Sequence, residues 1–213
     1  MIYKLLQGGF TLKIVQIHTL LSVGEFEESP TYQKIEKEII SAVGCIRYPE
    51  GADGFYLFNG KKQNGVVPIK NAFIQRLDEL GWKNEHICDS LIKPRKIDST
   101  KLLKPRKYFG VEWETGNISS SHRALNRITL GIRDGLLEGG VLVLPSRKMC
   151  EYLTDRVGNF QEIESYFPIW EDQSYAFRAR KQSAVIKVIE IEHDGLRNDI
   201  PPITKGPEGR AKG

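Results

Sequence analysis

Two glutamates, Glu112 and Glu114, are separated by one residue in an apolar stretch and could bind a metal ion or transfer a proton. In a β-strand, side chains two residues apart point to the same face. Val111 and Trp113 would then face a core, and both carboxylates the opposite side. A third acid, Asp98, lies just upstream, behind an expected turn. Three acids at one strand end can bind a hard divalent metal through oxygen ligands, as hydrolysis of a phosphate ester requires.

The same pattern has a simpler interpretation. Apolar residues that alternate with acidic ones are also typical of a half-exposed strand with one solvated face. Spacing alone leaves both interpretations open. The tetrapeptide KPRK occurs twice, at residues 93–96 and 104–107, on either side of Asp98. Two basic clusters beside acids would suit a polyanionic substrate, and the alternative is a solvated loop.

Composition is that of an ordinary globular protein. The chain has 213 residues, of which 40% are hydrophobic and 27% charged, and a formal net charge of +4. This length allows one sizeable core, and the mildly basic balance permits an anionic partner without requiring one. No apolar run approaches the ~20 residues of a membrane span, and residues 1–10 do not resemble a signal peptide. Three scattered cysteines form no CxxC pair, which favours a reducing, cytoplasmic setting over zinc or disulfide frameworks.

Strand and helix patterns alternate along the chain. Strands are predicted at residues 12–17, 55–58, 110–115, 139–145 and 184–191, and helices after Ser29, over 73–80, from 117, and at 149–157 and 161–167. Residues 83–108 are polar and predicted to be irregular. The alternation predicts an α/β fold, with a central mixed β-sheet flanked by helices, in a single domain over 1–213. Residues 194–213, rich in Pro, Gly and Lys, are predicted to form a C-terminal arm.

A longer motif around the two glutamates resembles a known enzyme family. The run GVEWETGNISSSHR at 110–123 is similar to the active-site strand and following helix of the BamHI family of type II restriction endonucleases. The similarity continues in NGVVPIK at 64–70 and YLTDRVGNF at 152–160. The first 60 residues are more similar to the related BglII and BstYI enzymes. The resemblance implies a restriction-endonuclease-like core, called PD-(D/E)xK, with Glu114 where most such nucleases have lysine.

The resemblance also implies roles for individual acids. Asp98 and Glu112 match the two metal-binding acids, and Glu114 matches the residue proposed as general base. Glu85 matches a further acid near the metals. The spacing from Asp98 to Glu112 is shorter than in the family, so Asp89 is the alternative for the first acid. The implied cofactor is Mg²⁺, at two ions per active site, and we expect little or no activity without divalent metal.

Other residues match DNA-binding positions of the family. Asp155 and Arg156 match the pair that reads the major groove, since arginine can pair with guanine and aspartate can accept from cytosine. The remaining implied DNA-binding residues are Lys70, Asn117, Ser119 and Arg123. A surface ion pair is the simpler interpretation of Asp155 and Arg156, and a helix cap that of Asn117 and Ser119.

The implied partners are double-stranded DNA and a second copy of the chain, because a palindromic site implies a two-fold dimer. The helix after Ser119 resembles the family's dimer helix. The implied target is GGATCC or another GATC-centred palindrome, and Glu208 and Arg210 depart from the family's arm. No nucleoside triphosphate is expected, since the chain has no GxxxxGK[ST] loop, and no membrane, since no apolar run is long enough to span one.

Three other functions compete with this one. A repair-type or mobile-element nuclease with the same metal core would cut without sequence preference, and a DNA-binding protein would lack catalysis altogether. A carboxylate-pair glycosidase usually brings its two acids from separate elements, whereas here both lie on one expected strand.

Overall fold

The computed structural model describes residues 12–88, 95–154 and 157–205. Six strands form one sheet in the order β1-β7-β6-β5-β4-β3. They are β1 (Lys13–Val23), β3 (Lys83–Cys88), β4 (Arg95–Lys104), β5 (Lys107–Trp113), β6 (Leu137–Pro145) and β7 (Ala184–Glu192). Strands β5, β6 and β7 are parallel, whereas β1, β4 and β3 pair antiparallel with their neighbours. The expected mixed central sheet is therefore confirmed.

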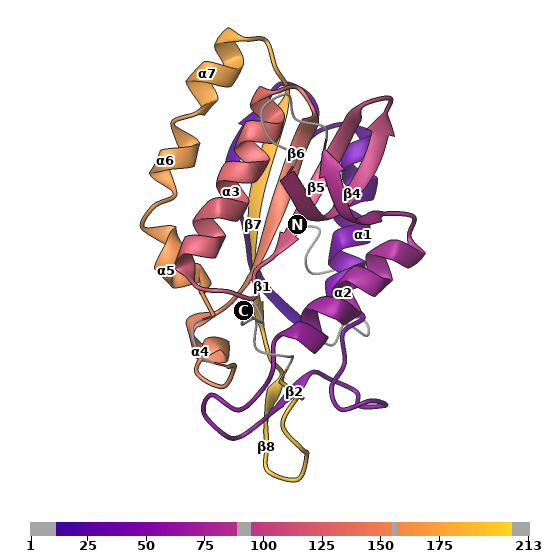
Figure 1. The fold of residues 1–213 in the computed structure, drawn as a ribbon, viewed down its shortest axis with the longest axis vertical. Coiled ribbons are helices and arrows are strands. Elements are labelled where there is room, and N and C mark those ends of the chain that lie inside the picture. The colour runs from indigo at the N-terminus through magenta and orange to yellow at the C-terminus, as the bar shows by residue number, and fades with distance from the viewer. Residues whose placement is uncertain (1–11, 89–94, 155–156, 206–213) are drawn as a thin grey trace, which may run out of the picture.

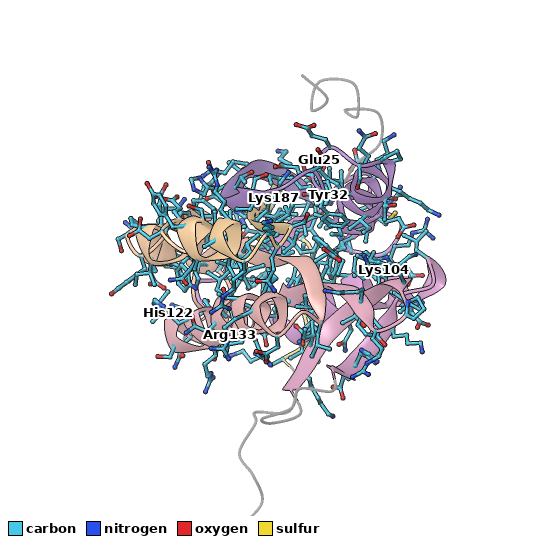
Figure 2. The ribbon with its side chains drawn as sticks, turned by 90° about the horizontal axis from the view of Figure 1, so that it is seen from above. Glu25, Tyr32, Lys104, His122, Arg133 and Lys187 are labelled. Carbon is cyan, nitrogen blue, oxygen red and sulfur yellow. The ribbon has the colours of Figure 1, made fainter. Side chains whose placement is uncertain are left out.

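Helices cover both faces of this sheet (Figure 1). One face carries α1 (Pro30–Gly44) and α2 (Val67–Glu79), and the other carries α3 (Ile118–Arg133), α5 (Phe160–Glu164), α6 (Pro168–Glu171) and α7 (Ser174–Ala179). In Figure 2, Tyr32 and Lys187 lie on the α1 side, and His122 and Arg133 lie on α3 across the sheet. No helix within the described ranges is long and apolar enough to cross a membrane.

The central strands are buried on both faces. Phe109, Val111 and Trp113 of β5 pack into the core under α1 and α2. Leu142 and Leu144 of β6 point the other way, into the core under α3. Parallel strands between two helical layers are normally apolar on both sides, so a charged residue in them is unusual. The interpretation of a half-exposed, solvated strand is therefore wrong.

Two local predictions are also wrong. Residues 83–108 contain β3, β4 and the start of β5 rather than irregular chain. Edge strand β3 and the Lys-, Ser- and Thr-rich β4 have no apolar alternation to reveal them. The helix predicted at 149–157 is only α4 (Arg147–Cys150), after which the described chain turns. The helix does not continue, because Thr154 N donates to Asn64 O at 2.8 Å rather than to a carbonyl of the preceding turn.

The side chain of a buried asparagine, Asn64, bonds the C-terminal segment to the rest of the fold. This segment begins with β8 (Gly195–Arg197), which pairs in parallel with the short strand β2 (Tyr56–Phe58). Asn64 Oδ1 accepts from Ile203 N at 3.3 Å, and Asn64 Nδ2 donates to Tyr152 O at 3.0 Å. Gly65 N donates to Ile203 O at 2.8 Å. The start of the predicted arm is therefore packed through residue 205, and residues 206–213 lie outside the described part.

We expect Gly65→Ala to destabilise the protein by about 1–3 kcal/mol, as overpacking usually does. A β-carbon at Gly65 would overlap the carbonyl oxygen of Thr204. Urea denaturation measures the loss. Gly195→Ala is the matched control, because its β-carbon would lie 3.5 Å from the nearest atom of Tyr56. Equal stabilities of the two variants would contradict the close approach.

Candidate active site

The acids predicted around β5 meet where the β4–β5 ladder ends. The last residue pair of this ladder is Ser99 with Val111, and Asp98 and Glu112 are the next residues outward on each strand. Asp98 Oδ2 accepts a hydrogen bond from Trp113 N at 2.9 Å. A side-chain oxygen thus bonds to a strand amide beyond the end of the ladder. The structure places the two acids on adjacent strands, as a shared site requires.

Glu112 is the electrostatically strained member of the pair. Its exposed fraction is 4%. Burial and, after it, the negative charge of Asp98 together raise the pKa of Glu112 to about 8, against the opposing charges of Arg127 and Lys70. Arg127 Nε lies 3.1 Å from Glu112 Oε1, but without hydrogen-bond geometry, so this buried oxygen has no hydrogen bond. Perturbation of this kind is common in functional sites.

Two cations from opposite faces of the sheet reach these acids. Lys70 Nζ of α2 donates to Asp98 Oδ1 at 2.6 Å. Arg127 of α3 pairs with Glu112, and its Nη1 donates to Lys96 O on β4 at 2.8 Å. The sequence pointed to Lys70 as a DNA-binding residue and missed Arg127. Nothing in the motif marks Arg127, because only the packing of α3 on the sheet, mainly on β6, brings its side chain to Glu112.

Glu114 lies just beyond the end of β5 and bonds to its own loop. Its Oε1 accepts from Gly116 N at 2.5 Å. Burial raises the pKa of Glu114, and the amides of Gly116 and Thr115 partly offset this. Strand β5 ends at Trp113, but Glu114 N still donates to Val143 O of β6 at 3.1 Å. The charge of Asp98 also contributes to the raised pKa of Glu114.

The side chain of Glu85 is paired with a lysine of the neighbouring strand. It is exposed on β3 and pairs with Lys96, with 2.9 Å between Nζ and Oε2. This ion pair lowers the pKa of Glu85. In the ranges described, no group of three or more His, Cys, Asp or Glu side chains is arranged to hold a metal. Asp89, the alternative to Asp98, lies outside those ranges.

The second basic cluster does not flank the acids. Residues 104–107 form the turn between β4 and β5, at the opposite end of β4 from Asp98. Lys104 and Lys107 both pair with Glu138, at 3.3 and 3.9 Å. Figure 2 places Lys104 on this hairpin. Half of the first cluster, residues 93 and 94, lies outside the described residues, so the prediction of a basic frame around the site finds no support here.

The start of α3 presents polar side chains near the acids. Asn117 caps the helix, since its Oδ1 accepts from Ser120 N at 3.3 Å. Asn117, Ser119 and Arg123 are all exposed. Arg123 Nη2 donates to Ser120 Oγ at 2.6 Å. The interpretation of Asn117 as a cap is confirmed, and its exposure leaves the amide accessible to a ligand.

Asp155 and Arg156 lie outside the described residues, but the chain on either side is anchored. Thr154 N donates to Asn64 O at 2.8 Å, on the segment that leads into α2. Gly158 N donates to Gly116 O at 2.7 Å, in the loop that follows Glu114. The described neighbours of this pair are therefore joined to the loops before Lys70 and after Glu114.

The residues present fit a hard divalent cation. Asp98 and Glu112 supply carboxylate oxygens, and Glu112 Oε1 is buried without a hydrogen bond. Mg²⁺ in proteins is usually held by one or two carboxylates, with water and substrate phosphate as the other ligands. A cation between the two acids would also remove the repulsion that raises the pKa of Glu112.

Comparisons with known proteins agree on one family. The family model described as restriction endonuclease BamHI matches residues 12–210. The type II restriction enzyme OkrAI of Oceanobacter kriegii is 41% identical over 202 residues, covering 94% of this chain and 99% of that enzyme. BamHI of Bacillus amyloliquefaciens is 33% identical over 190 residues, covering 85% and 82%. The structure of BglII with a DNA 16-mer is alike in fold, with a TM-score of 0.52 and 12% identity over 83% of this chain and 76% of that chain.

We expect Glu112→Gln to stabilise the metal-free protein increasingly as pH rises. The folded state keeps Glu112 protonated up to about pH 8, whereas an unfolded chain releases that proton near pH 4.5. The stability due to the neutral carboxyl is thus complete below pH 4.5 and lost toward pH 8. An amide stays neutral, so the variant should gain on the order of a few kcal/mol across this window. Chemical denaturation in EDTA measures it, and a pH-independent difference would contradict the raised pKa.

Proposed function

Because the chain belongs to the BamHI family of type II restriction endonucleases, we propose that it hydrolyses double-stranded DNA at a GATC-centred palindrome with Mg²⁺. GGATCC is the first candidate, as the sequence resemblance implies. The observation that carries the proposal is that Asp98 and Glu112 lie on adjacent strands, one residue beyond the last pair of the β4–β5 ladder. It occurs in a chain that is 41% identical to a type II restriction enzyme over 94% of its length.

Asp98 and Glu112 would hold the metal, as one or two Mg²⁺ ions, and Glu85 on the adjacent strand is a further ligand in this proposal. When bound, the metal would acidify water and neutralise charge at the scissile phosphate. Glu114 would orient the attacking water and accept its proton. Burial raises the pKa of Glu114, which makes its carboxylate a stronger proton acceptor.

Sequence recognition would fall to side chains at the start of α3 and to the pair Asp155 and Arg156. Exposed Asn117 and Ser119 at the start of α3 would contact bases, and Arg123 would contact a phosphate. Asp155 and Arg156 would read a C·G pair in the major groove, a role that rests on the family resemblance. The net charge of +4 supports a polyanionic ligand.

A homodimer would present two such sites to a palindrome. Its proposed interface includes the side of α3 that faces away from the sheet. Two exposed apolar residues beside this helix, Tyr166 at 45% and Ile169 at 54% exposure, support that location. The ring centroid of Tyr166 lies 4.7 Å from that of His122 on α3. Sedimentation of the free protein would test the dimer.

The proposal is tested by incubating the protein with unmethylated plasmid DNA and Mg²⁺ and sequencing every new end. We expect discrete fragments that share one palindrome, and no cleavage in EDTA. Asp98→Asn should reduce the rate by about three orders of magnitude, because metal stabilisation of the transition state amounts to several kcal/mol. A smear of lengths would instead identify a nuclease without sequence preference. Cleavage in EDTA would contradict the metal mechanism.

We expect Arg156→Lys to reduce cleavage of the cognate site selectively. Lysine keeps the positive charge but loses the planar fork that pairs with guanine O6 and N7. The fall in kcat/KM for the cognate site should correspond to about 1–3 kcal/mol, whereas the affinity for unrelated DNA should change little. Arg147→Lys, an exposed arginine on α4, is the control. If Arg156→Lys weakened cognate and unrelated DNA equally, Arg156 would be a phosphate contact instead.

A further inference from the structure

One oxygen of Asp98 is held by a lysine rather than by the backbone. Asp98 Oδ2 is occupied by the amide of Trp113, so Oδ1 is the oxygen that a metal could take. Lys70 Nζ lies 2.6 Å from that oxygen. The exposed side-chain fractions are 26% for Lys70 and 21% for Asp98, so the pair is only partly in contact with solvent. Solvent therefore screens this ion pair less than it screens a surface pair.

The charge of Lys70 also reaches the other acids of the site. Its positive charge acts to lower the pKa of Glu85, and it partly offsets the rise in the pKa of Glu112 and of Glu114. Arg127 and Lys96, by contrast, make their closest carboxylate contacts with Glu112 and Glu85 respectively. Lys70 thus contacts Asp98 directly, and its charge also reaches Glu85, Glu112 and Glu114. A divalent metal ligated by Asp98 would exert its charge from nearly the same place.

We infer that Lys70 is the resident counter-cation of the metal-free site, displaced from Asp98 Oδ1 when metal binds and then free to contact DNA. The inference rests on the proposed function, in which Asp98 is a metal ligand. Lysine and metal compete for one oxygen, so each weakens the binding of the other. Release of the ammonium group couples metal binding to DNA binding through a single side chain. It also reconciles the Lys70–Asp98 ion pair with the DNA-binding role that the sequence implies for Lys70.

The competition is tested by titrating Mn²⁺ into the DNA-free protein and following the free ion by electron paramagnetic resonance. Lys70→Met should tighten Mn²⁺ binding by about fivefold or more, the lower end of typical coupling between two ligands. Lys70→Arg, which keeps the charge, should stay close to the wild type. Lys70→Gln gives the same test should the methionine variant fold poorly. Unchanged or weaker Mn²⁺ affinity in folded Lys70→Met or Lys70→Gln would overturn the inference.

Lys83→Met is the matched control for charge alone. Lys83 lies on β3 and pairs in register with Thr100. Its substitution removes the same charge as Lys70→Met but leaves the ion pair with Asp98 intact. We expect it to change Mn²⁺ affinity much less than Lys70→Met does. An equal effect of the two substitutions would reduce the role of Lys70 to long-range electrostatics and overturn the displacement.

The release of Lys70 to DNA is tested by measuring the Kd for a GGATCC duplex in Ca²⁺ and in EDTA. The gain in affinity from Ca²⁺ should be larger for the wild type than for Lys70→Met, because only the wild type has an ammonium group to release. Equal gains would overturn this step. A wild type that makes no Mg²⁺-dependent cuts would refute the proposed function itself. A wild type that cuts, with unchanged Mn²⁺ affinity in Lys70→Met, would refute only the inference about Lys70.

Discussion

The placement of two carboxylates at the end of one strand ladder, with little water around them, is the constraint on which the site depends. Glu112 is buried between helical layers, and Asp98 lies on the adjacent strand. Burial and the negative charge of Asp98 both disfavour the ionised form of Glu112, so its pKa is raised. A stable core would not need such a pair, because apolar side chains of similar size pack there without electrostatic repulsion. Its presence is best understood as a requirement of metal-dependent chemistry.

The rest of the fold supplies the charges and the rigidity that this pair needs. Helix α2 brings Lys70 to Asp98 from one face, and α3 brings Arg127 to Glu112 from the other. The segment before α2 is fixed by Asn64, a fully buried side chain that bonds to the chain near residues 152 and 203. The same asparagine anchors the residue before Asp155. The segments proposed to act in catalysis and in DNA reading are thereby joined, through their described neighbours, to one framework.

Much of this arrangement could be predicted from the chain, and the reasons for the failures are physical. Strands β6 and β7 and helices α1 and α3 were found because their apolar periods are strong. Strands β3 and β4 were missed because their stability comes from pairing with β5 rather than from an apolar face of their own.

The acids of the site could be located from spacing and motif, but their partners could not. Lys70 and Asp98 are 28 positions apart, and no local pattern indicates that they form an ion pair. Arg127 belongs to the helix that resembles the family's dimer helix. Its contact with Glu112 follows only from how α3 packs on the sheet. The bond of Glu114 to its own loop likewise depends on where β5 ends, a boundary that alternation alone does not define.

The most direct test is anomalous diffraction from Mn²⁺ in crystals of the protein bound to its DNA. We expect a manganese peak bonded to Asp98 and Glu112, next to the scissile phosphate, with Lys70 Nζ moved away from Asp98 Oδ1. A peak that lies away from both carboxylates, or an intact Lys70–Asp98 ion pair beside a bound metal, would contradict the account.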